Sequence, residues 1–424
     1  AAAAAGTRGI PLLSFVRSGG TRLQEGMAAL VGIPRAALAL DSLAAAGVAH
    51  LAIADHPTTG GVWVAIVSRA DLRIGAAGAT VGFSGPEVAA AMTGIAIPSA
   101  SHTAESAQAA GLLDEVLPGP LIGDWLGRVL AALCPRAAPT PASARAPERA
   151  PERAPGVASR PASDRSPGGD IEAAHSVDAW EHIHASRTVE RLGGGALLAL
   201  VVDEPVDLSG GDEAVRAVVG RSALGRPAVG VALAARRGAR PGPRGYRLLA
   251  RAAQLADRLG LDLVTLIDTP GADPGTASEA SGVAPEIAHA MAAVLACRSP
   301  VLAVVHGEGG SGGALAAAVG DAVLVGPHGY FAALGPEGAA RALHRSPQEA
   351  ARLMRPAPAD LLELGFADAG CPADPEDLRD MLARRLADLG AIETKARLAG
   401  RHARWSGALP GYGQLGHPEL PAPP

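Results

Sequence analysis

The sequence GEGGSGGA occupies residues 307–314, between an apolar run at 301–305 and an alanine-rich segment. An apolar run of this length predicts a buried strand, and the alanine-rich segment predicts a helix. Glycines between them allow backbone angles closed to other residues and let a ligand approach the main chain closely. The stretch therefore predicts an α/β fold with a turn lined by backbone at the end of a strand.

An earlier copy of this pattern lies about 250 residues upstream. Each copy has a double glycine, an aspartate and a Gly-Pro-Glu turn, and sixteen residues separate the aspartate from the glutamate in both. These landmarks are Gly60-Gly61, Asp71 and Gly85-Pro86-Glu87 in one copy, and Gly312-Gly313, Asp321 and Gly335-Pro336-Glu337 in the other. A fold unit written twice predicts two matched domains with two backbone-built sites.

Composition and charge narrow the class of protein. The net charge of −5 over 424 residues gives no reason to expect a nucleic-acid partner. Three scattered cysteines (Cys134, Cys297 and Cys371) form neither a disulfide framework nor a zinc site. No charge-free apolar run reaches the length of a membrane span. We therefore expect a cytoplasmic protein without a metal, nucleic-acid or membrane partner.

A region rich in Pro, Ala and Arg at 135–170 separates the two copies. This composition predicts an extended linker. It divides the chain into a first domain at 1–134, a second at 171–390 and a C-terminal tail at 391–424. In the second domain we expect strands near 229–233, 263–267 and 301–305, and helices near 246–259 and 284–297. Strands that alternate with helices predict parallel sheets.

Residues 307–314 also fit the dinucleotide fingerprint G-x-G-x-x-G, through Gly307, Gly309 and Gly312. That fingerprint needs an acidic residue at the end of the next strand to hold a ribose. The next expected strand, near 322–325, ends without one. The dinucleotide interpretation is therefore weak.

The same residues fit the nucleophile elbow of serine hydrolases, G-x-S-x-G, with Ser311 as the nucleophile. Only Asp321 with His328 or His344 could complete a catalytic triad. Asp321 and His328 are close in sequence for members of one triad. A further possibility is that the glycines serve only the packing of a helix on a strand.

We favour a third function for the glycines, the donation of backbone N–H groups to an anion. Gly312-Gly313 would act with Gly271-Ala272, which ends the neighbouring strand. In the first copy, Gly60-Gly61 would act with Gly19-Gly20. Each domain would then carry one oxyanion hole.

With these residues in view, the chain resembles the carboxyltransferase component of acetyl-CoA carboxylase, in the form that fuses the β and α subunits. The β-type segments are S-G-G-T-R-L-Q-E-G at 18–26, P-T-T-G-G-V at 57–62 and G-F-S-G-P at 82–86. The α-type segments are D-A-W-E at 178–181, I-D-T-P-G-A at 267–272 and G-E-G-G-S-G-G-A at 307–314. The resemblance covers most of the chain outside the linker and the tail.

The resemblance implies two crotonase-like domains of repeated ββα units. It implies transfer of carboxylate from carboxybiotin to acetyl-CoA, which gives malonyl-CoA for fatty acid synthesis. The site would lie where a β-type and an α-type domain face each other across a homodimer. Gly60-Gly61 would stabilise the thioester enolate, and Gly312-Gly313 would hold the ureido oxygen of biotin. A bulky residue at Gly61 or Gly313 would then abolish the reaction in a protein that stays folded.

The sequence also bears on the partners. The only lysine, Lys395, follows a threonine, so the chain has no Met-Lys biotin-acceptor motif. Biotin would arrive on a separate biotin carboxyl carrier protein, charged by a biotin carboxylase. Arg236 and Arg240 lie in a basic loop that would meet the phosphates of CoA or the carboxylate of carboxybiotin. The alternative for this loop is a solvated surface turn.

Three features depart from the family's pattern. The four-cysteine zinc ribbon of the β subunit is missing. The first domain begins at its Ser-Gly-Gly segment, so we expect it to be truncated at its N-terminus. Glu87 stands where the family usually has an arginine. These departures leave other biotin-dependent acyl-CoA carboxylases, a malonate decarboxylase component or a truncated, non-catalytic homologue as alternatives.

Overall fold

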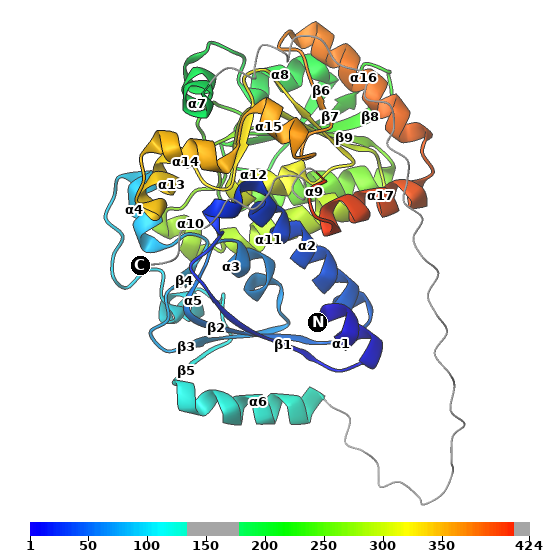
Figure 1. Ribbon diagram of the computed structural model, residues 1–424. Helices are drawn as coiled ribbons and strands as arrows, with labels where there is room; N and C mark the ends of the chain where they lie inside the picture. Colours follow the sequence, from blue (N-terminus) through cyan, green and yellow to red (C-terminus); the bar gives the residue numbers. More distant parts are fainter. Residues whose placement is uncertain (134–177, 411–424) are drawn as a thin grey trace, which may run out of the picture.

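The structure is a computed structural model, which describes residues 1–133 and 178–410 (Figure 1). These residues form two α/β domains, one below the other in Figure 1, each built around its own sheet. The linker expected at 135–170 lies outside the described residues, as do residues 411–424 of the expected tail. The prediction of an α/β fold in two domains is confirmed.

The first domain has a parallel sheet in the order β1-β2-β3-β5, with the short β4 paired to β2. The strands are β1 (Leu12–Ser18), β2 (His50–Thr59), β3 (Leu72–Ala76), β4 (Val81–Gly82) and β5 (Glu115–Leu117). Its helices are α1 (Ala2–Arg8), α2 (Gly26–Ala45), α3 (Gly61–Ala65), α4 (Pro86–Thr93), α5 (Ala104–Ala109) and α6 (Gly119–Leu133), with 3-10 turns η1 (Leu23–Glu25) and η2 (Val67–Arg69).

The second domain has the strand order β13-β11-β10-β9-β8-β7-β6, with β12 paired to β10. The strands are β6 (Asp203–Leu208), β7 (Val215–Arg221), β8 (Pro227–Leu233), β9 (Asp262–Thr269), β10 (Val301–Gly310), β11 (Ala322–Val325), β12 (Tyr330–Ala332) and β13 (Ala369–Gly370). The pairs from β8 to β13 are parallel, as expected. The pairs β6–β7 and β7–β8 are antiparallel, and the two added strands, β6 and β7, were not predicted from the sequence.

Eleven helices surround this second sheet in the part of the chain that the structure describes. They are α7 (Ala179–Thr188), α8 (Gly194–Val201), α9 (Pro243–Leu259), α10 (Thr276–Ala280), α11 (Val283–Ala296), α12 (Ser311–Ala318), α13 (Pro336–Leu343), α14 (Pro347–Met354), α15 (Pro358–Glu363), α16 (Pro375–Ala391) and α17 (Thr394–Ser406). The strands and helices expected in this domain are confirmed. Helix α17, in the region assigned to the tail, is packed into the folded body through the buried Trp405.

The two sheets repeat one topology. The order β1-β2-β3-β5 corresponds to β9-β10-β11-β13, and β4 on β2 corresponds to β12 on β10. The repeated aspartates have the same structural function in both copies. Asp71 accepts a hydrogen bond from the amide of His50 at 2.8 Å, and Asp321 accepts one from Val301 at 2.8 Å. Each carboxylate joins the beginnings of two neighbouring strands, which explains why the aspartate recurs.

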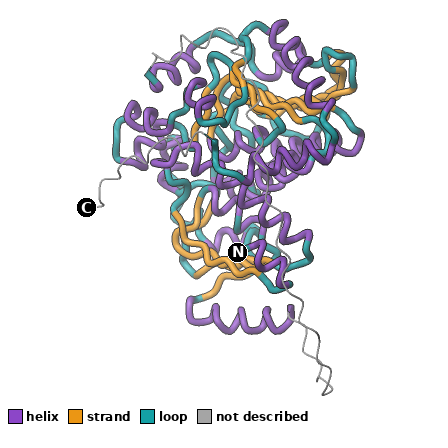
Figure 2. The backbone as a smooth tube through the Cα atoms, turned by 45° about the vertical axis from the view of Figure 1, so that its right-hand side comes forward, coloured by secondary structure: helices purple, strands orange, loops and turns teal. Residues whose placement is uncertain are grey.

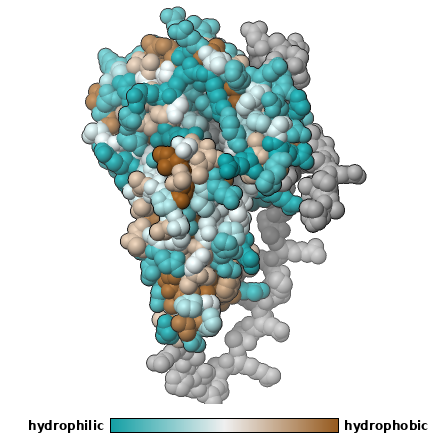
Figure 3. All heavy atoms as spheres, turned by 90° about the vertical axis from the view of Figure 1, so that its left-hand side faces the viewer, coloured by the Kyte–Doolittle hydropathy of each residue, from teal (hydrophilic) through white to brown (hydrophobic). Residues whose placement is uncertain are grey.

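Helices of both domains lie between the two sheets (Figure 2). Helix α2 contacts α17, α11 and α12 of the second domain, and α3 contacts α11. Among the described helices, α2 alone is long and apolar enough to cross a membrane by length and composition. Its buried residues, which include Leu30 and Leu43, belong to the cores of this molecule. Apolar surface gathers at the lower end of the molecule, where α6 lies (Figure 3).

Candidate functional site

Strand β1 ends in a turn, the first turn, that hydrogen bonds of the Ser18 side chain stabilise. The hydroxyl of Ser18 accepts the amide of Gly20 at 3.3 Å and lies 3.2 Å from the carbonyl oxygen of Gly20, to which it donates. Gly20 has φ of 120°, which L side chains rarely adopt, so glycine is needed here. The amide of Gly20 is thus used inside the turn. Gly20 was predicted to bind substrate, but its amide is not available as a hydrogen-bond donor for that contact.

Strand β9 ends in a turn of the same kind, the second turn. The hydroxyl of Thr269 accepts the amide of Gly271 at 3.2 Å and donates to the carbonyl of Gly271 at 3.1 Å. Gly271 has φ of 118°, within a few degrees of its counterpart Gly20. The two turns are therefore copies of each other in hydrogen bonding as well as in sequence. Gly20 and Gly271 shape the turns, while Thr21 and Ala272 are the residues that follow them.

The second half of each site is the turn from a strand into a helix. Strand pairing aligns Ser18 with Thr58 in one sheet and Thr269 with Gly309 in the other. This register makes Ser311 the counterpart of Gly60, and both have positive φ, 61° and 71°. The counterpart of Gly61 is therefore Gly312. The sequence alignment that matched Gly61 with Gly313 was shifted by one residue.

The backbone amides of Gly61, Gly312, Thr21 and Ala272 are free to receive a ligand. The amide of Gly60 bonds to the carbonyl of Gly82 at 3.0 Å, so Gly60 is not a donor to substrate. Gly61 and Gly312 lie in the first turns of α3 and α12, where amides have no partner within the helix. Among the described residues, no acceptor outside those helices bonds to them. The same holds for the amides of Thr21 and Ala272.

The two turns line one cavity of about 120 Å³ between the domains. Gly19, Gly20, Thr21, Gly60 and Gly61 come from the first domain, and Gly271, Ala272, Ser311 and Gly312 from the second. Apolar side chains that include Ile33, Phe83, Met92 and Leu334 form the walls. No charged side chain of the described residues lines the cavity. A single chain thus supplies both turns to one chamber, whereas the resemblance implied that they meet across a dimer.

Gly313 lies behind this cavity and does not line it. A Cβ built on Gly313 would stand 2.5 Å from the hydroxyl of Tyr246 and 2.6 Å from the amide nitrogen of Ala272. A side chain at such short distances from its neighbours would force the backbone apart. The expectation that the protein stays folded with a bulky residue at Gly313 is therefore wrong by this geometry. Gly313 allows α12 to pack against the second turn.

Gly307 and Gly309 also serve packing. A Cβ on Gly307 would overlap the ion pair between Asp268 and Arg191, whose atoms are 2.6 Å apart. A Cβ on Gly309 would overlap the ring of Phe331. Burial raises the pKa of Asp268, while Arg191 opposes that rise. The packing interpretation is thus correct for these glycines, and it leaves no room at Gly307 and Gly309 for a dinucleotide.

Ser311 has the strained turn of a nucleophile elbow but lacks a catalytic base. Among the described residues, no histidine bonds to its hydroxyl. Asp321 is held by Arg401, whose Nη2 lies 2.5 Å from its Oδ2, and by the amide of Val301. His344 ends α13 and is not among the residues lining the cavity. The hydrolase interpretation therefore finds no triad here.

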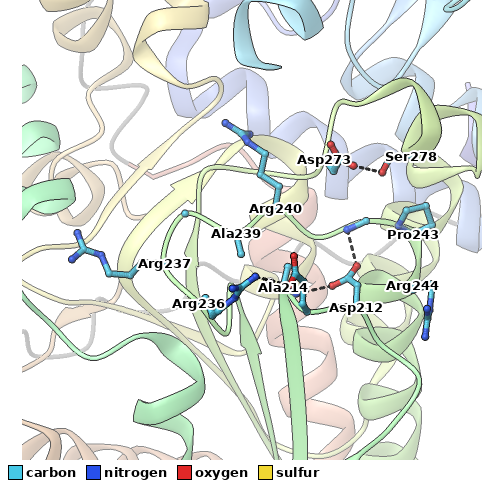
Figure 4. Close-up of a pocket in the computed structure, with 13 residues that line it drawn as sticks. Asp212, Ala214, Arg236, Arg237, Ala239, Arg240, Pro243, Arg244, Asp273 and Ser278 are labelled. Atoms are coloured by element: carbon cyan, nitrogen blue, oxygen red, sulfur yellow. Dashed lines mark hydrogen bonds and ion pairs between the residues drawn. The ribbon is translucent and has the colours of Figure 1, made fainter. Parts of the chain in front are cut away.

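The basic loop lines a separate cavity of about 720 Å³ (Figure 4). Arg236 is exposed and its Nη2 lies 2.5 Å from Oε2 of Glu213. Arg240 is half-buried and donates to the carbonyl of Pro270, 3.5 Å away, beside the second turn. Burial lowers the pKa of the Arg240 guanidinium, and Glu308 and Asp273 oppose that change. The two predicted arginines thus have different surroundings, and of the two only Arg240 lies near a glycine turn.

The glutamates of the two Gly-Pro-Glu turns do not share a function. Each lies in the first turn of a helix, where a negative charge is favourable. Glu337 is bound by Arg187, whose Nη1 lies 2.5 Å from its Oε1. Glu87 is exposed. The repeat thus preserves helix geometry, and only the second copy adds an ion pair.

Among the residues that line the cavity, sequence reasoning did not assign Thr21 or Ile33 to the site, and it considered Ser311 only as a hydrolase nucleophile. Aligning Gly20 with Gly271 would have placed Thr21 opposite Ala272. Ile33 carried no signal, since it is an ordinary apolar residue of a helix. A further missed residue is Glu279, whose carboxylate accepts the amide of Phe83 at 2.8 Å across the domain boundary.

Comparisons with known proteins show which family the chain belongs to. A family model described as acetyl co-enzyme A carboxylase carboxyltransferase-like matches residues 172–405. The acetyl-CoA carboxylase carboxyl transferase subunits beta/alpha of Salinispora arenicola are 35% identical over 383 residues. That match covers 86% of this chain and 65% of the relative, so the chain spans less than two thirds of its length.

Two other matches carry different names. A probable biotin-dependent acyl-coenzyme A carboxylase beta3 subunit of Mycobacterium bovis is 32% identical over 400 residues, covering 91% of this chain and 75% of that protein. The crystal structure of the P. aeruginosa geranyl-CoA carboxylase beta subunit matches at 19% identity and a TM-score of 0.44. This match covers 93% of this chain and 75% of that one.

Proposed function

This chain belongs to the acetyl-CoA carboxylase carboxyltransferase family, and we propose that it transfers a carboxyl group from carboxybiotin to an acyl-CoA thioester. The observation that carries the proposal is the cavity into which both glycine turns face. An acceptor thioester and a carboxyl donor must meet within a few ångströms for the group to pass between them. One chamber with free amides from each domain meets that requirement.

Each pair of amides has a proposed ligand. The amides of Thr21 and Gly61 would hold the thioester oxygen, which becomes negative as the enolate forms. The amides of Ala272 and Gly312 fit the ureido oxygen of biotin, since both are unpaired donors beside the apolar chamber. Carboxybiotin would supply the carboxyl group, and its ureido nitrogen, once its bond to CO2 has broken, would be the base for the α-proton. An uncharged cavity agrees with a reaction in which the protein contributes position and fixed dipoles.

We propose acetyl-CoA as the acceptor and malonyl-CoA, used for fatty acid synthesis, as the product. The fused beta/alpha relatives bear the name of that reaction. The acyl-coenzyme A carboxylase relative favours a second candidate, a longer acyl-CoA as the acceptor. The two are distinguished by the relative rates with acetyl-CoA and with longer thioesters.

The basic loop has a proposed part in binding. Arg240 would meet an anionic group close to the second turn, because it is half-buried and has no carboxylate bonded to it in the described residues. Arg236 would contact CoA phosphates at the rim after exchanging its exposed partner Glu213. We further propose a biotin carboxyl carrier protein and a biotin carboxylase as partners, a homodimer as the assembly, and the cytoplasm as the location.

A matched pair of glycine variants tests the proposal. A Cβ on Gly61 would meet only flexible atoms within 3.4 Å, and so would a Cβ on Gly312. Neither glycine has positive φ, so Gly61→Ala and Gly312→Ala should fold. We expect the wild type to form malonyl-CoA from acetyl-CoA and a carboxylated biotin carrier. Each variant keeps its backbone amide, but the added methyl group crowds the approach of a ligand to that amide. We therefore expect kcat/KM to fall by about a hundredfold, the size of effect known for loss of one oxyanion donor.

Melting temperature and circular dichroism serve as the controls for folding. Unchanged kcat/KM in both variants would contradict the assignment of the two turns. No carboxyl transfer by the wild type to any acyl-CoA would contradict the proposed function itself.

A further inference from the structure

Ile33 lies at the meeting point of the two glycine turns. A Cβ built on Gly61 would stand 3.0 Å from Cδ1 of Ile33, and one built on Gly312 would stand 3.3 Å from the same atom. Ile33 is only 6% exposed, and it comes from α2, which belongs to neither turn. One side chain thus contacts the donor residues of both domains.

The same side chain separates two cavities. The chamber of about 120 Å³ lies on one side, and a more open groove of about 350 Å³ along α2 lies on the other. Only Gly20, Thr21, Ile33 and Gly61 line both. Gly20, Thr21 and Gly61 belong to the site of the first domain, so a ligand held at the Gly61 amide could extend into either space. Ile33 decides whether the two spaces are joined.

We propose that Ile33 is the specificity-determining residue that limits the acyl group to a short chain. This inference rests on the proposed function, with the thioester oxygen on the amide of Gly61. An acyl chain whose carbonyl oxygen is bonded to this amide would pass close to Cδ1 of Ile33. That atom would stand only 3.0 Å from a Cβ built on Gly61, so little space is left beside the amide. Acetyl and propionyl groups fit beside Ile33, and longer chains collide with it. A smaller residue at 33 joins the chamber to the groove and admits them.

Kinetics with acyl-CoA thioesters of two lengths test this. We compare wild type, Ile33→Val and Ile33→Ala with acetyl-CoA and butyryl-CoA. One misplaced methylene in an apolar pocket changes kcat/KM by roughly 10- to 200-fold. We therefore expect the butyryl-to-acetyl ratio of kcat/KM to rise at least tenfold in Ile33→Ala and by less in Ile33→Val. Ile33→Phe should lower the rate with both thioesters.

Leu38→Ala is the matched control. Leu38 lies on the same helix and is 8% exposed, but it lines neither cavity. It should lose thermal stability as Ile33→Ala does and keep the wild-type substrate ratio. An unchanged ratio in Ile33→Ala, or the same change in Leu38→Ala, would overturn the inference.

A binding arm keeps this inference separate from the proposed function. Dissociation constants for non-reactive acetyl and butyryl thioether analogues of acyl-CoA are measured by calorimetry. The ratio of the two constants should change at least tenfold in Ile33→Ala, whether or not the protein transfers a carboxyl group. Absence of transfer in every variant, with this change in the binding ratio, would count against the proposed function alone.

Discussion

Strands β1 and β9 end in the same turn but occupy different places in their sheets. Strand β9 lies between β8 and β10, and all its residues are buried. Strand β1 lies at the edge of the described sheet, and its Phe15 is 66% exposed. The second turn is therefore supported on both sides by its own domain. The first turn has a neighbouring strand on one side only.

The first domain receives part of its support from the second. Glu279 on α10 accepts the amide of Phe83, a residue that lines the shared cavity. Helix α17 packs on α2, and Arg35 of α2 donates to the carbonyl of Gly407 at 2.7 Å. The second site is instead fixed by contacts such as Tyr246 against Gly313 within its own core. Two copies of one backbone site therefore depend on different parts of the molecule.

The largest effect should come from filling the space at Gly313. In Gly313→Val the new side chain overlaps Tyr246 and the amide of Ala272, so the second domain should lose its folded packing. Gly19→Ala should leave stability unchanged, because no atom outside the neighbouring residues lies within 4 Å of a Cβ there. Urea denaturation followed by tryptophan fluorescence measures both. If Gly313→Val were as stable as the wild type, the proposed difference in packing between the two sites would be contradicted.

The next effect compares the two repeated aspartates. Asp321 is buried and paired with Arg401 and Arg397, so Asp321→Asn leaves buried arginines without their anion. Breaking such a pair costs about 4 kcal/mol. Asp71 is exposed, and its only hydrogen-bond partner in the described part of the chain is the amide of His50, so Asp71→Asn should cost about 1 kcal/mol. Urea titration gives the free energy of unfolding of each variant. Equal losses of stability in Asp321→Asn and Asp71→Asn would refute the expected difference.

A smaller, pH-dependent effect concerns the contact between domains. Burial raises the pKa of Glu279 from 4.5 to about 7, and the hydrogen bond from Phe83 opposes that rise. Between these values the folded protein keeps a proton that the unfolded chain has released, so stability should fall as pH rises from 5 to 8. The shift corresponds to a loss of up to about 3 kcal/mol.

The variant Glu279→Gln keeps an acceptor for Phe83 and removes this titration. Its stability relative to wild type should therefore increase from pH 5 to pH 8. Burial also lowers the pKa of the nearby His102, but that histidine is present in both proteins and cancels in the difference. A difference in stability that does not change with pH would show that Glu279 does not titrate in this range.

Much of this fold could be predicted because the signals were local. Apolar runs with small-residue turns predicted β9 and β10, and the spacing of glycine, aspartate and Gly-Pro-Glu predicted the duplication. The one-residue shift between Gly313 and Gly312 could not be found in the same way, since it depends on which strand residues are paired. Side-chain contacts such as Ser18 with Gly20 decided which amides were free. Ile33 and Glu279 were missed because their contacts come from distant segments.

We propose that the two turns hold two different ligands in one chamber. A crystal structure of the protein with acetyl-CoA and biotin tests this most directly. We expect the thioester oxygen within about 3 Å of the amide nitrogen of Gly61. We expect the ureido oxygen at the same distance from the amide nitrogen of Gly312. Binding of either ligand away from these amides, with the chamber between the turns left empty, would contradict it.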